Sequence, residues 1–145
     1  EVFNHNLETV ARLQSALRPG ASFERSLNVL RHARQRLPEP CAVKSGLMLG
    51  MGETDDEIAD ALDQLREAGC NLLTLGQYLA PDREHAPVRR FVPPDAFDHW
   101  RQRAEAIGFE GVASGPLVRS SYRAQAALAS YRARRADPAG CEAAV

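Results

Sequence analysis

The sequence predicts an α/β fold in which parallel strands alternate with helices, and three observations carry this prediction. An apolar run at 42–49 is typical of a buried strand, and a second such run follows at 71–75. Between them, Thr54 and Glu57 form a capping box, and apolar residues recur at helical spacing until Gly69. A strand, a helix and a strand in succession form a right-handed parallel unit, which fits either a barrel or an open doubly wound sheet.

The flanking segments extend the same alternation. Residues 2–6 are expected to be the end of a strand, and a helix is expected from about 22 to 37, before two prolines. A proline-rich connection at 80–87 precedes a helix at about 95–107 and a short last strand at 109–113. The chain beyond is expected to be helical at first and then frayed from 137.

Composition limits the classes of protein to consider. The chain has 145 residues, of which 44% are hydrophobic and 26% charged, so it can bury a core. Its formal net charge of −1 gives no electrostatic reason to bind nucleic acid or a membrane. No apolar run has the length of a membrane span, and we expect a cytoplasmic protein.

Cysteine and histidine do not form a metal centre by their spacing. The three cysteines are far apart and odd in number, which fits neither a disulfide framework nor a Cys-x-x-Cys pair. Among the four histidines, only His5 lies in a segment that resembles a site. A complete metal centre is therefore not expected from this sequence.

Segment 44–53 joins the first buried strand to the capped helix through a glycine-rich turn, a junction where α/β enzymes bind ligands. It lacks both the Gly-Lys-Ser/Thr ending of a P-loop and the third glycine of a dinucleotide fingerprint. Glu53 also places a carboxylate where phosphates would sit. Spacing alone favours an ordinary turn whose glycines serve the backbone.

Polar residues nevertheless follow three of the predicted strands, at 4–8, 45–53 and 76–78. The carboxyl ends of parallel strands share one face of a barrel. We therefore expect these three segments to converge on one ligand.

Four runs, at 2–9, 44–53, 76–79 and 115–122, resemble the C-terminal half of lipoyl synthase, a radical S-adenosylmethionine enzyme. They occur in the family's order within about residues 1–125, and the last contains the Arg-Ser-Ser-Tyr signature. The pattern Gly46-x-Met48-x-Gly50-x-x-Glu53 also resembles the Gly-x-Ile-x-Gly-x-x-Glu pattern of radical S-adenosylmethionine barrels, with Met in place of Ile.

The resemblance implies a domain organisation. Residues 1–113 would be the C-terminal part of a partial (β/α)6 TIM-type radical S-adenosylmethionine barrel. Residues 114–136 would form an extension with the signature and a helix, and 137–145 a disordered tail.

The resemblance also implies a binding site for S-adenosylmethionine. Leu47 and Met48 would form a wall against the adenine, and the ribose hydroxyls would meet Asn6 and Glu8. Arg25 would bind the carboxylate of the methionine moiety. The implied cofactor-binding residues are Asn6, Glu8, Arg25, Gly46, Leu47, Met48, Gly50, Glu53 and Gln77.

Read without the resemblance, several of these residues have ordinary explanations. Asn6 would be a turn or cap residue, Glu8 a solvated charge at a helix start, and Arg25 an exposed helix arginine. Lys44, the single lysine of the chain, would either point into the barrel near substrate or cluster, or lie solvated at a strand edge. Both sets of alternatives stay open at this point.

The Arg-Ser-Ser-Tyr signature implies a metal ligand. The resemblance assigns Ser121 to an auxiliary [4Fe-4S] cluster held otherwise by cysteines, with Ser120 as the less favoured ligand and Arg119 as an electrostatic neighbour. A single oxygen ligand among thiolates suits a cluster that is consumed as the sulfur source. The serine pair alone would be interpreted as a helix cap.

The implied activity is the insertion of two sulfur atoms, at C6 and C8, into an octanoyl chain on a lipoyl-carrier protein. Two [4Fe-4S] clusters, S-adenosylmethionine and an electron donor such as ferredoxin or flavodoxin would take part, in the bacterial cytoplasm. The cysteine motifs for both clusters are absent from this sequence and are expected in a missing N-terminal half. We therefore expect the chain alone to be inactive and to bind no intact cluster.

Two other functions remain open. A non-catalytic half-barrel that binds a nucleoside or a partner chain would show an exposed apolar edge. Another sulfur-inserting enzyme of the same superfamily, such as biotin synthase, is disfavoured by the Arg-Ser-Ser-Tyr signature.

Overall fold

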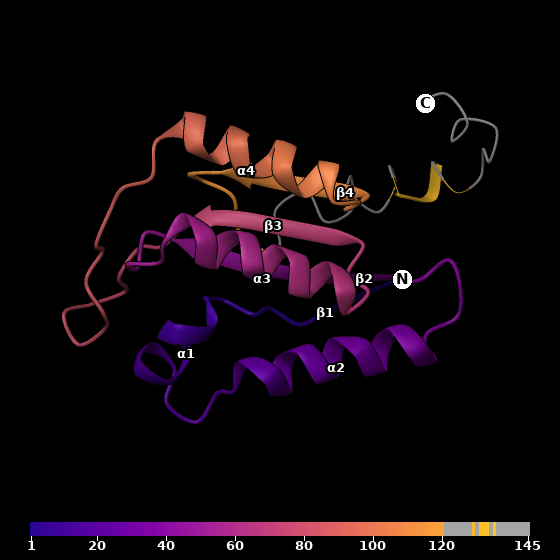
Figure 1. Cartoon of the computed structure of the whole chain (residues 1–145), viewed down its shortest axis with the longest axis horizontal. Helices are drawn as coiled ribbons and strands as arrows, with labels where there is room; N and C mark the ends of the chain where they lie inside the picture. The colour runs from indigo at the N-terminus through magenta and orange to yellow at the C-terminus, as the bar shows by residue number, and fades with distance from the viewer. Residues whose placement is uncertain (121–128, 130, 134, 136–145) are drawn as a thin grey trace.

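The computed structural model describes residues 1–120, 129, 131–133 and 135. Strands and helices alternate through this part of the chain (Figure 1). In order they are β1 (Val2–Asn4), α1 (Ala11–Leu17), α2 (Phe23–Arg36), β2 (Ala42–Leu49), α3 (Asp55–Glu67), β3 (Leu72–Gln77), α4 (Pro94–Ala106) and β4 (Gly111–Gly115).

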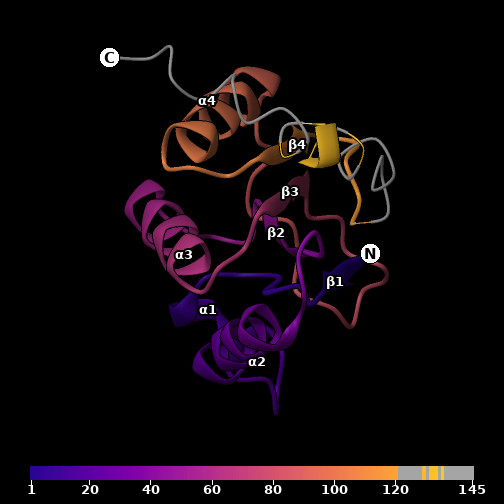
Figure 2. The same cartoon turned by 90° about the vertical axis from the view of Figure 1, so that its right-hand side faces the viewer.

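The strands form one parallel sheet in the order β1-β2-β3-β4, which is their order in the sequence. Helices α1, α2, α3 and α4 lie together on one side of this sheet (Figure 2). A doubly wound sheet would have a switch in strand order, and the four described strands show none. The α/β prediction is confirmed, and the arrangement is compatible with part of a barrel.

The core lies between the sheet and the helices. Leu30 of α2, Leu62 of α3 and Phe97 of α4 are almost fully buried in one apolar cluster with Leu47 and Leu73 of the sheet. Burying side chains of this size stabilises the fold by about 1.5–3 kcal/mol each. Ala42 and Leu72 of the sheet lie outside this cluster and pack against Tyr131 instead.

Local signals place most of the helix starts correctly. The predicted capping box at α3 is confirmed, because the Thr54 hydroxyl accepts from Glu57 N–H and the Glu57 carboxylate accepts from Thr54 N–H. Ser22 caps α2 by accepting from Arg25 N–H at 3.2 Å. Gly69 ends the α3 region with φ of 90°, a backbone geometry that suits glycine.

Two elements differ from the prediction. Helix α1 is absent from the predicted elements, since it has only seven residues and its N-cap, Val10, makes no side-chain hydrogen bond. Strand β4 begins at Gly111, two residues after the predicted start at 109. Phe109 instead belongs to the turn after α4, where its N–H donates to Ala104 O and its side chain is buried.

The amino ends of the strands are covered by Tyr131 and Arg135, two of the described residues near the C-terminus. Tyr131 is fully buried against Ala42 and Leu72, and its hydroxyl donates to Glu39 at 3.2 Å. Arg135 pairs with the same Glu39 at 2.8 Å. This end of the sheet is thus closed by packing and ion pairing. Residues 137–145 of the expected tail lie outside the described residues.

Among the residues that the structure describes, no helix is long and apolar enough to cross a membrane.

Helices α1 and α3 are joined by an ion pair whose strength depends on pH. Arg12 donates to Glu57 at 2.6 and 3.0 Å and to Gly52 O at 2.9 Å. The hydrogen bond from Arg12, followed by the one from Thr54 N–H, lowers the pKa of Glu57 from 4.5 to about 2. A carboxyl whose pKa is lowered by folding stabilises the fold above its unfolded pKa, and this stabilisation is lost as pH falls toward 2.

Glu57→Gln keeps an acceptor for Thr54 N–H but removes the charge. Between about pH 5 and 2, the window set by the unfolded and folded pKa values of Glu57, we expect the melting temperature of the wild type to fall more steeply than that of Glu57→Gln. Only the wild type loses this ion pair in that range. Circular dichroism melts across this range measure the difference. Glu67→Gln, at an exposed position of α3, is the control and should follow the wild type. Parallel pH profiles for Glu57→Gln and the wild type would contradict the assignment.

Candidate functional site

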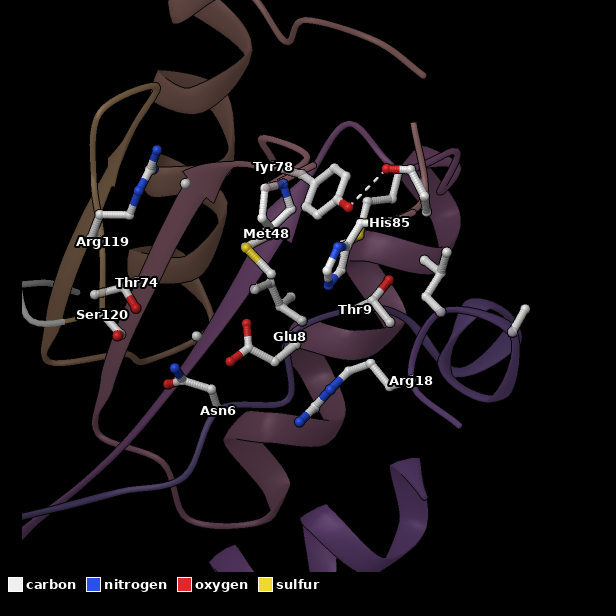
Figure 3. A pocket seen from close by; sticks show the side chains of 18 of the residues that line it. Asn6, Glu8, Thr9, Arg18, Met48, Thr74, Tyr78, His85, Arg119 and Ser120 are labelled. Atoms are coloured by element: carbon white, nitrogen blue, oxygen red, sulfur yellow. Dashed lines mark hydrogen bonds between the residues drawn. The ribbon is translucent and has the colours of Figure 1, made fainter. Parts of the chain in front are cut away.

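A cavity of about 750 Å³ opens at the carboxyl ends of the strands (Figure 3). This volume is in the usual range for small-molecule sites. Its walls come from the segments that follow each strand and from the loop between β3 and α4. The lining residues with polar or charged side chains are Asn6, Glu8, Thr9, Arg18, Thr74, Tyr78, Glu84, His85, Arg119 and Ser120.

Gly46 gives the floor of the cavity its shape. A Cβ at this position would lie 2.6 Å from Thr74 Oγ1 and 3.2 Å from Asn6 Oδ1. The missing side chain therefore lets these two polar groups approach the strand and leaves a flat surface beside Met48. A planar ligand can lie against such a surface.

Glu8 is held in an unusual backbone conformation at the cavity. Its φ is 71°, which is uncommon for a residue other than glycine and costs about 1 kcal/mol. Two hydrogen bonds to β2 hold it there, from Glu8 N–H to Gly46 O at 2.9 Å and from Met48 N–H to Glu8 O at 2.8 Å. The half-buried carboxylate points into the cavity near Asn6 and Met48 (Figure 3).

Two buried oxygens of the cavity wall have no hydrogen-bond partner in the structure. These are Asn6 Oδ1 and the hydroxyl oxygen of Thr9, a residue that is only 2% exposed. Buried polar groups in native proteins are almost always paired. Their position on the cavity wall indicates a ligand with polar groups of its own.

The side chain of Gln77 fixes the rim of the cavity from behind. Its Nε2 donates to Tyr78 O at 2.9 Å and Arg90 O at 3.0 Å, and its Oε1 accepts from Val92 N–H at 2.8 Å. These three bonds tie the returning end of the β3–α4 connection to the end of β3. A single buried amide therefore holds the loop that forms one wall.

The turn after β2 is tied into the same network. Gly50 has φ of 104°, and a Cβ there would meet Gln77 Nε2 at 2.5 Å and collide with Arg90 O. The Glu53 carboxylate accepts from Gly50 N–H at 2.5 Å and Met51 N–H at 2.9 Å. The Glu53 carboxylate thus stabilises the turn by binding the backbone N–H groups of Gly50 and Met51.

The segment after β4 crosses the inner face of the sheet. It can lie close because a Cβ on Gly76 would collide with Val118 O. Arg119 donates to Val118 O at 2.9 Å, and Lys44 Nζ donates to Ser120 O. Ser120 reaches the cavity wall by this route, whereas Ser121 lies outside the described residues.

Lys44 is buried within the sheet, with 3% of its surface exposed. Its solvated alternative is therefore wrong. Burial removes its amino group from water and thereby lowers its pKa. None of the ion pairs among the described residues involves Lys44, so no carboxylate offsets this effect. The Ser120 carbonyl is the partner that the structure gives this cation.

The structure brings the predicted residues together unequally. Asn6, Glu8, Gly46, Leu47 and Met48 line the cavity. The next predicted group, Gly50, Glu53 and Gln77, lies behind the wall and shapes it.

Arg25 is exposed on α2 and is not part of the lining. Arg18, which follows the unpredicted helix α1, is among the lining residues. Sequence reasoning also missed Thr9, Thr74 and His85. Thr9 stands inside the run 2–9 that already pointed to a site, whereas no local signal marks the other two.

Metal-binding chemistry is limited in the described part of the chain. No group of three His, Cys, Asp or Glu side chains there can hold a metal ion. Burial raises the pKa of the Cys70 thiol to about 12, which keeps it protonated and unreactive. His5, whose Nε2 is buried without a partner, does not line the cavity.

Fold and cavity together define a parallel α/β protein with a cavity of small-molecule size at the carboxyl edge of its sheet. Comparison with curated proteins then gives the relationship. The chain is 56% identical to a lipoyl synthase of Pseudomonas aeruginosa (strain LESB58) over 124 residues, which cover 86% of this chain and 38% of that protein. It is 56% identical to a lipoyl synthase of Acidithiobacillus ferrooxidans (strain ATCC 53993 / BNL-5-31) over 125 residues, or 86% and 39%.

A lipoyl synthase of Stutzerimonas stutzeri (strain A1501) is 55% identical over 124 residues. No protein-family model matches the chain. The predicted resemblance is thus confirmed: the chain is homologous to part of lipoyl synthase, and it spans about 38% of the length of these relatives.

Proposed function

We propose that this chain supplies the nucleoside-binding side of a lipoyl synthase, within a partial radical S-adenosylmethionine barrel. The observation that carries the proposal is the cavity wall made by Asn6, Glu8, Gly46 and Met48. It combines an apolar strand surface with unpaired polar atoms, in a chain that is 56% identical to lipoyl synthases.

The residues present fit S-adenosylmethionine. Met48 offers an apolar surface to the adenine and Gly46 keeps that surface open, whereas the predicted Leu47 side chain packs in the core between the sheet and the helices. The Glu8 carboxylate can accept hydrogen bonds from the vicinal ribose hydroxyls, and the unpaired Asn6 oxygen can accept a further one. Each neutral hydrogen bond of this kind contributes about 0.5–1.5 kcal/mol.

The carboxylate of the methionine moiety needs a cation, and Arg18 is placed for this role. It lines the same cavity as Glu8 (Figure 3), whereas Arg25 is exposed outside the lining. A guanidinium can bind a carboxylate with two parallel hydrogen bonds. Arg25 remains the prediction from sequence, and the geometry favours Arg18.

The ligands of the iron–sulfur clusters would lie outside the described residues. Bound S-adenosylmethionine and two [4Fe-4S] clusters would supply radical hydrogen abstraction and the sulfur for C6 and C8 of an octanoyl chain. The described residues hold no set of metal ligands, so we assign only Ser121 to the auxiliary cluster. We propose that the chain by itself is inactive and that the activity requires cluster cysteines supplied with it.

The remaining roles follow from the same proposal. The substrate would be an octanoylated lipoyl-carrier protein, the electron donor a ferredoxin or flavodoxin, and the compartment the bacterial cytoplasm. Residues 114–136 would act as an extension that carries the Arg-Ser-Ser-Tyr signature; the contacts of Val118 O with Gly76 and of Ser120 O with Lys44 support this role.

A second candidate is a half-barrel that binds a partner chain without catalysis. The exposure of Phe91 at 72% and Leu117 at 84% favours it, because large apolar side chains are usually covered in a working complex. The lipoyl synthase relatives disfavour a biotin synthase activity.

Substituting Arg18 tests the nucleoside site. Arg18→Ala should weaken binding of S-adenosylhomocysteine by about tenfold, because a charge-assisted hydrogen bond to its carboxylate is worth about 1.5–3 kcal/mol and the site is partly open to water. Isothermal titration calorimetry on the whole chain measures the affinity. Arg25→Ala is the matched control. An undiminished affinity in Arg18→Ala with a loss in Arg25→Ala would return the role to Arg25.

A chimera tests the activity. We expect the chain to restore lipoyl formation when it replaces the matching segment of the Pseudomonas aeruginosa lipoyl synthase, with mass spectrometry of the carrier as the measurement. Within that chimera, Ser121→Ala should reduce lipoyl formation much more than the cleavage of S-adenosylmethionine. Equal loss of both would count against Ser121 as a ligand, and a folded chimera without product would favour the partner-binding alternative.

A further inference from the structure

We propose that His85, oriented by Asp82, determines base specificity at the cavity by accepting a hydrogen bond from the exocyclic amino group of adenine. This inference rests on the proposed nucleoside site and adds the residue that distinguishes adenine from other purines. Asp82 and His85 lie on the β3–α4 connection, apart from the glycine-rich turn that follows β2.

Asp82 builds a tight turn that fixes the imidazole. One oxygen, Oδ1, accepts from Glu84 N–H at 2.8 Å and from His85 N–H at 3.2 Å. The same oxygen lies 2.7 Å from His85 Nδ1. The backbone of the turn and the ring of His85 are thus oriented by a single carboxylate group.

This contact decides which ring nitrogen carries the proton. A carboxylate beside Nδ1 is an acceptor, so the neutral imidazole keeps its proton on Nδ1 and leaves Nε2 as an acceptor. The hydrogen bond from His85 also lowers the pKa of Asp82, which keeps the carboxylate charged. In this neutral form, the second nitrogen of His85 is available to accept from a ligand.

The position of His85 in the cavity gives this acceptor its role. Its ring lines the same cavity as Met48 and Tyr78 and lies among the side chains drawn in Figure 3. Tyr78 is buried, with 8% of its surface exposed. Its hydroxyl donates at 2.8 Å to the carbonyl of Ala86, the residue that follows His85. Gln77 ties the far end of the connection to β3 through Arg90 and Val92.

An acceptor on this wall distinguishes purines by one group. Adenine presents an amino donor at C6, whereas hypoxanthine presents a carbonyl acceptor there. A site that accepts from the amino group leaves two acceptors facing each other when hypoxanthine binds, which is unfavourable.

Other charged groups line the cavity, and their effect on base preference has to be distinguished from that of His85. Glu84 belongs to the same turn, Glu8 extends from the segment after β1, and Arg18 follows α1. Glu84 is also an acceptor, so Glu84→Gln belongs in the experiment. We expect it to leave base preference unchanged, because its carboxylate takes no part in orienting the ring.

Calorimetric titration of the whole chain with adenosine and with inosine tests the inference. Wild type should bind adenosine about five- to tenfold more tightly than inosine, the ratio that one hydrogen bond provides. His85→Ala should bring this ratio close to one, with an unchanged melting temperature. His32→Ala, at an exposed position of α2, is the matched control and should keep the ratio of the wild type.

Asp82→Asn separates positioning from contact. Its amide can accept from or donate to Nδ1, so it no longer fixes the tautomer, and the adenosine preference should fall between those of the wild type and His85→Ala. Retention of the full preference in His85→Ala would overturn the proposal. Equal binding of both nucleosides by the wild type would overturn it and leave the nucleoside site standing, whereas binding of neither at millimolar concentration would overturn both.

Discussion

The buried amide of Gln77 is the interaction on which the shape of the site depends. It satisfies three backbone groups of the β3–α4 connection at once, and Gly50 has no side chain that would displace it. A buried amide that lost these partners would leave its own polar atoms unpaired, at a cost of about 1–3 kcal/mol for each group. The connection therefore has one favoured path, and that path places Tyr78 and His85 on the cavity wall.

A second constraint acts on the opposite wall. The chain after β4 can cross the sheet only because Gly76 leaves room for Val118, and the buried cation of Lys44 then meets the Ser120 carbonyl. Beyond the signature, Tyr131 closes the far end of the sheet against Ala42. Val118 and Tyr131 thus contact opposite ends of the same sheet.

Much of this fold follows from local signals in the sequence. The capping box at Thr54, the apolar run of β2 and the proline-marked start of α4 each act over a few residues, and each appears in the structure as predicted. Helix α1 escapes prediction because it is short and lacks a side-chain cap; its stability comes partly from Arg12, which pairs with Glu57 far along the chain.

The candidate site was harder to predict for the same physical reason. Strand ends of a parallel sheet converge by topology, so Asn6, Glu8 and Met48 could be grouped from sequence. Arg18 and His85 reach the cavity through loops whose paths are set by distant contacts, and no spacing rule reports these. Residue types alone favour a structural turn at 44–53, and the proposal of a ligand there depends on the relationship to lipoyl synthases.

Amide chemical-shift mapping with S-adenosylhomocysteine is the most direct test of a nucleoside site at the carboxyl edge of this sheet. We expect the largest shifts at the amides of Glu8, Leu47 and Met48, with further shifts at His85, because these line the cavity. Shifts confined to the opposite end of the strands, near Glu39 and Glu110, would contradict the account, as would a spectrum unchanged by millimolar ligand.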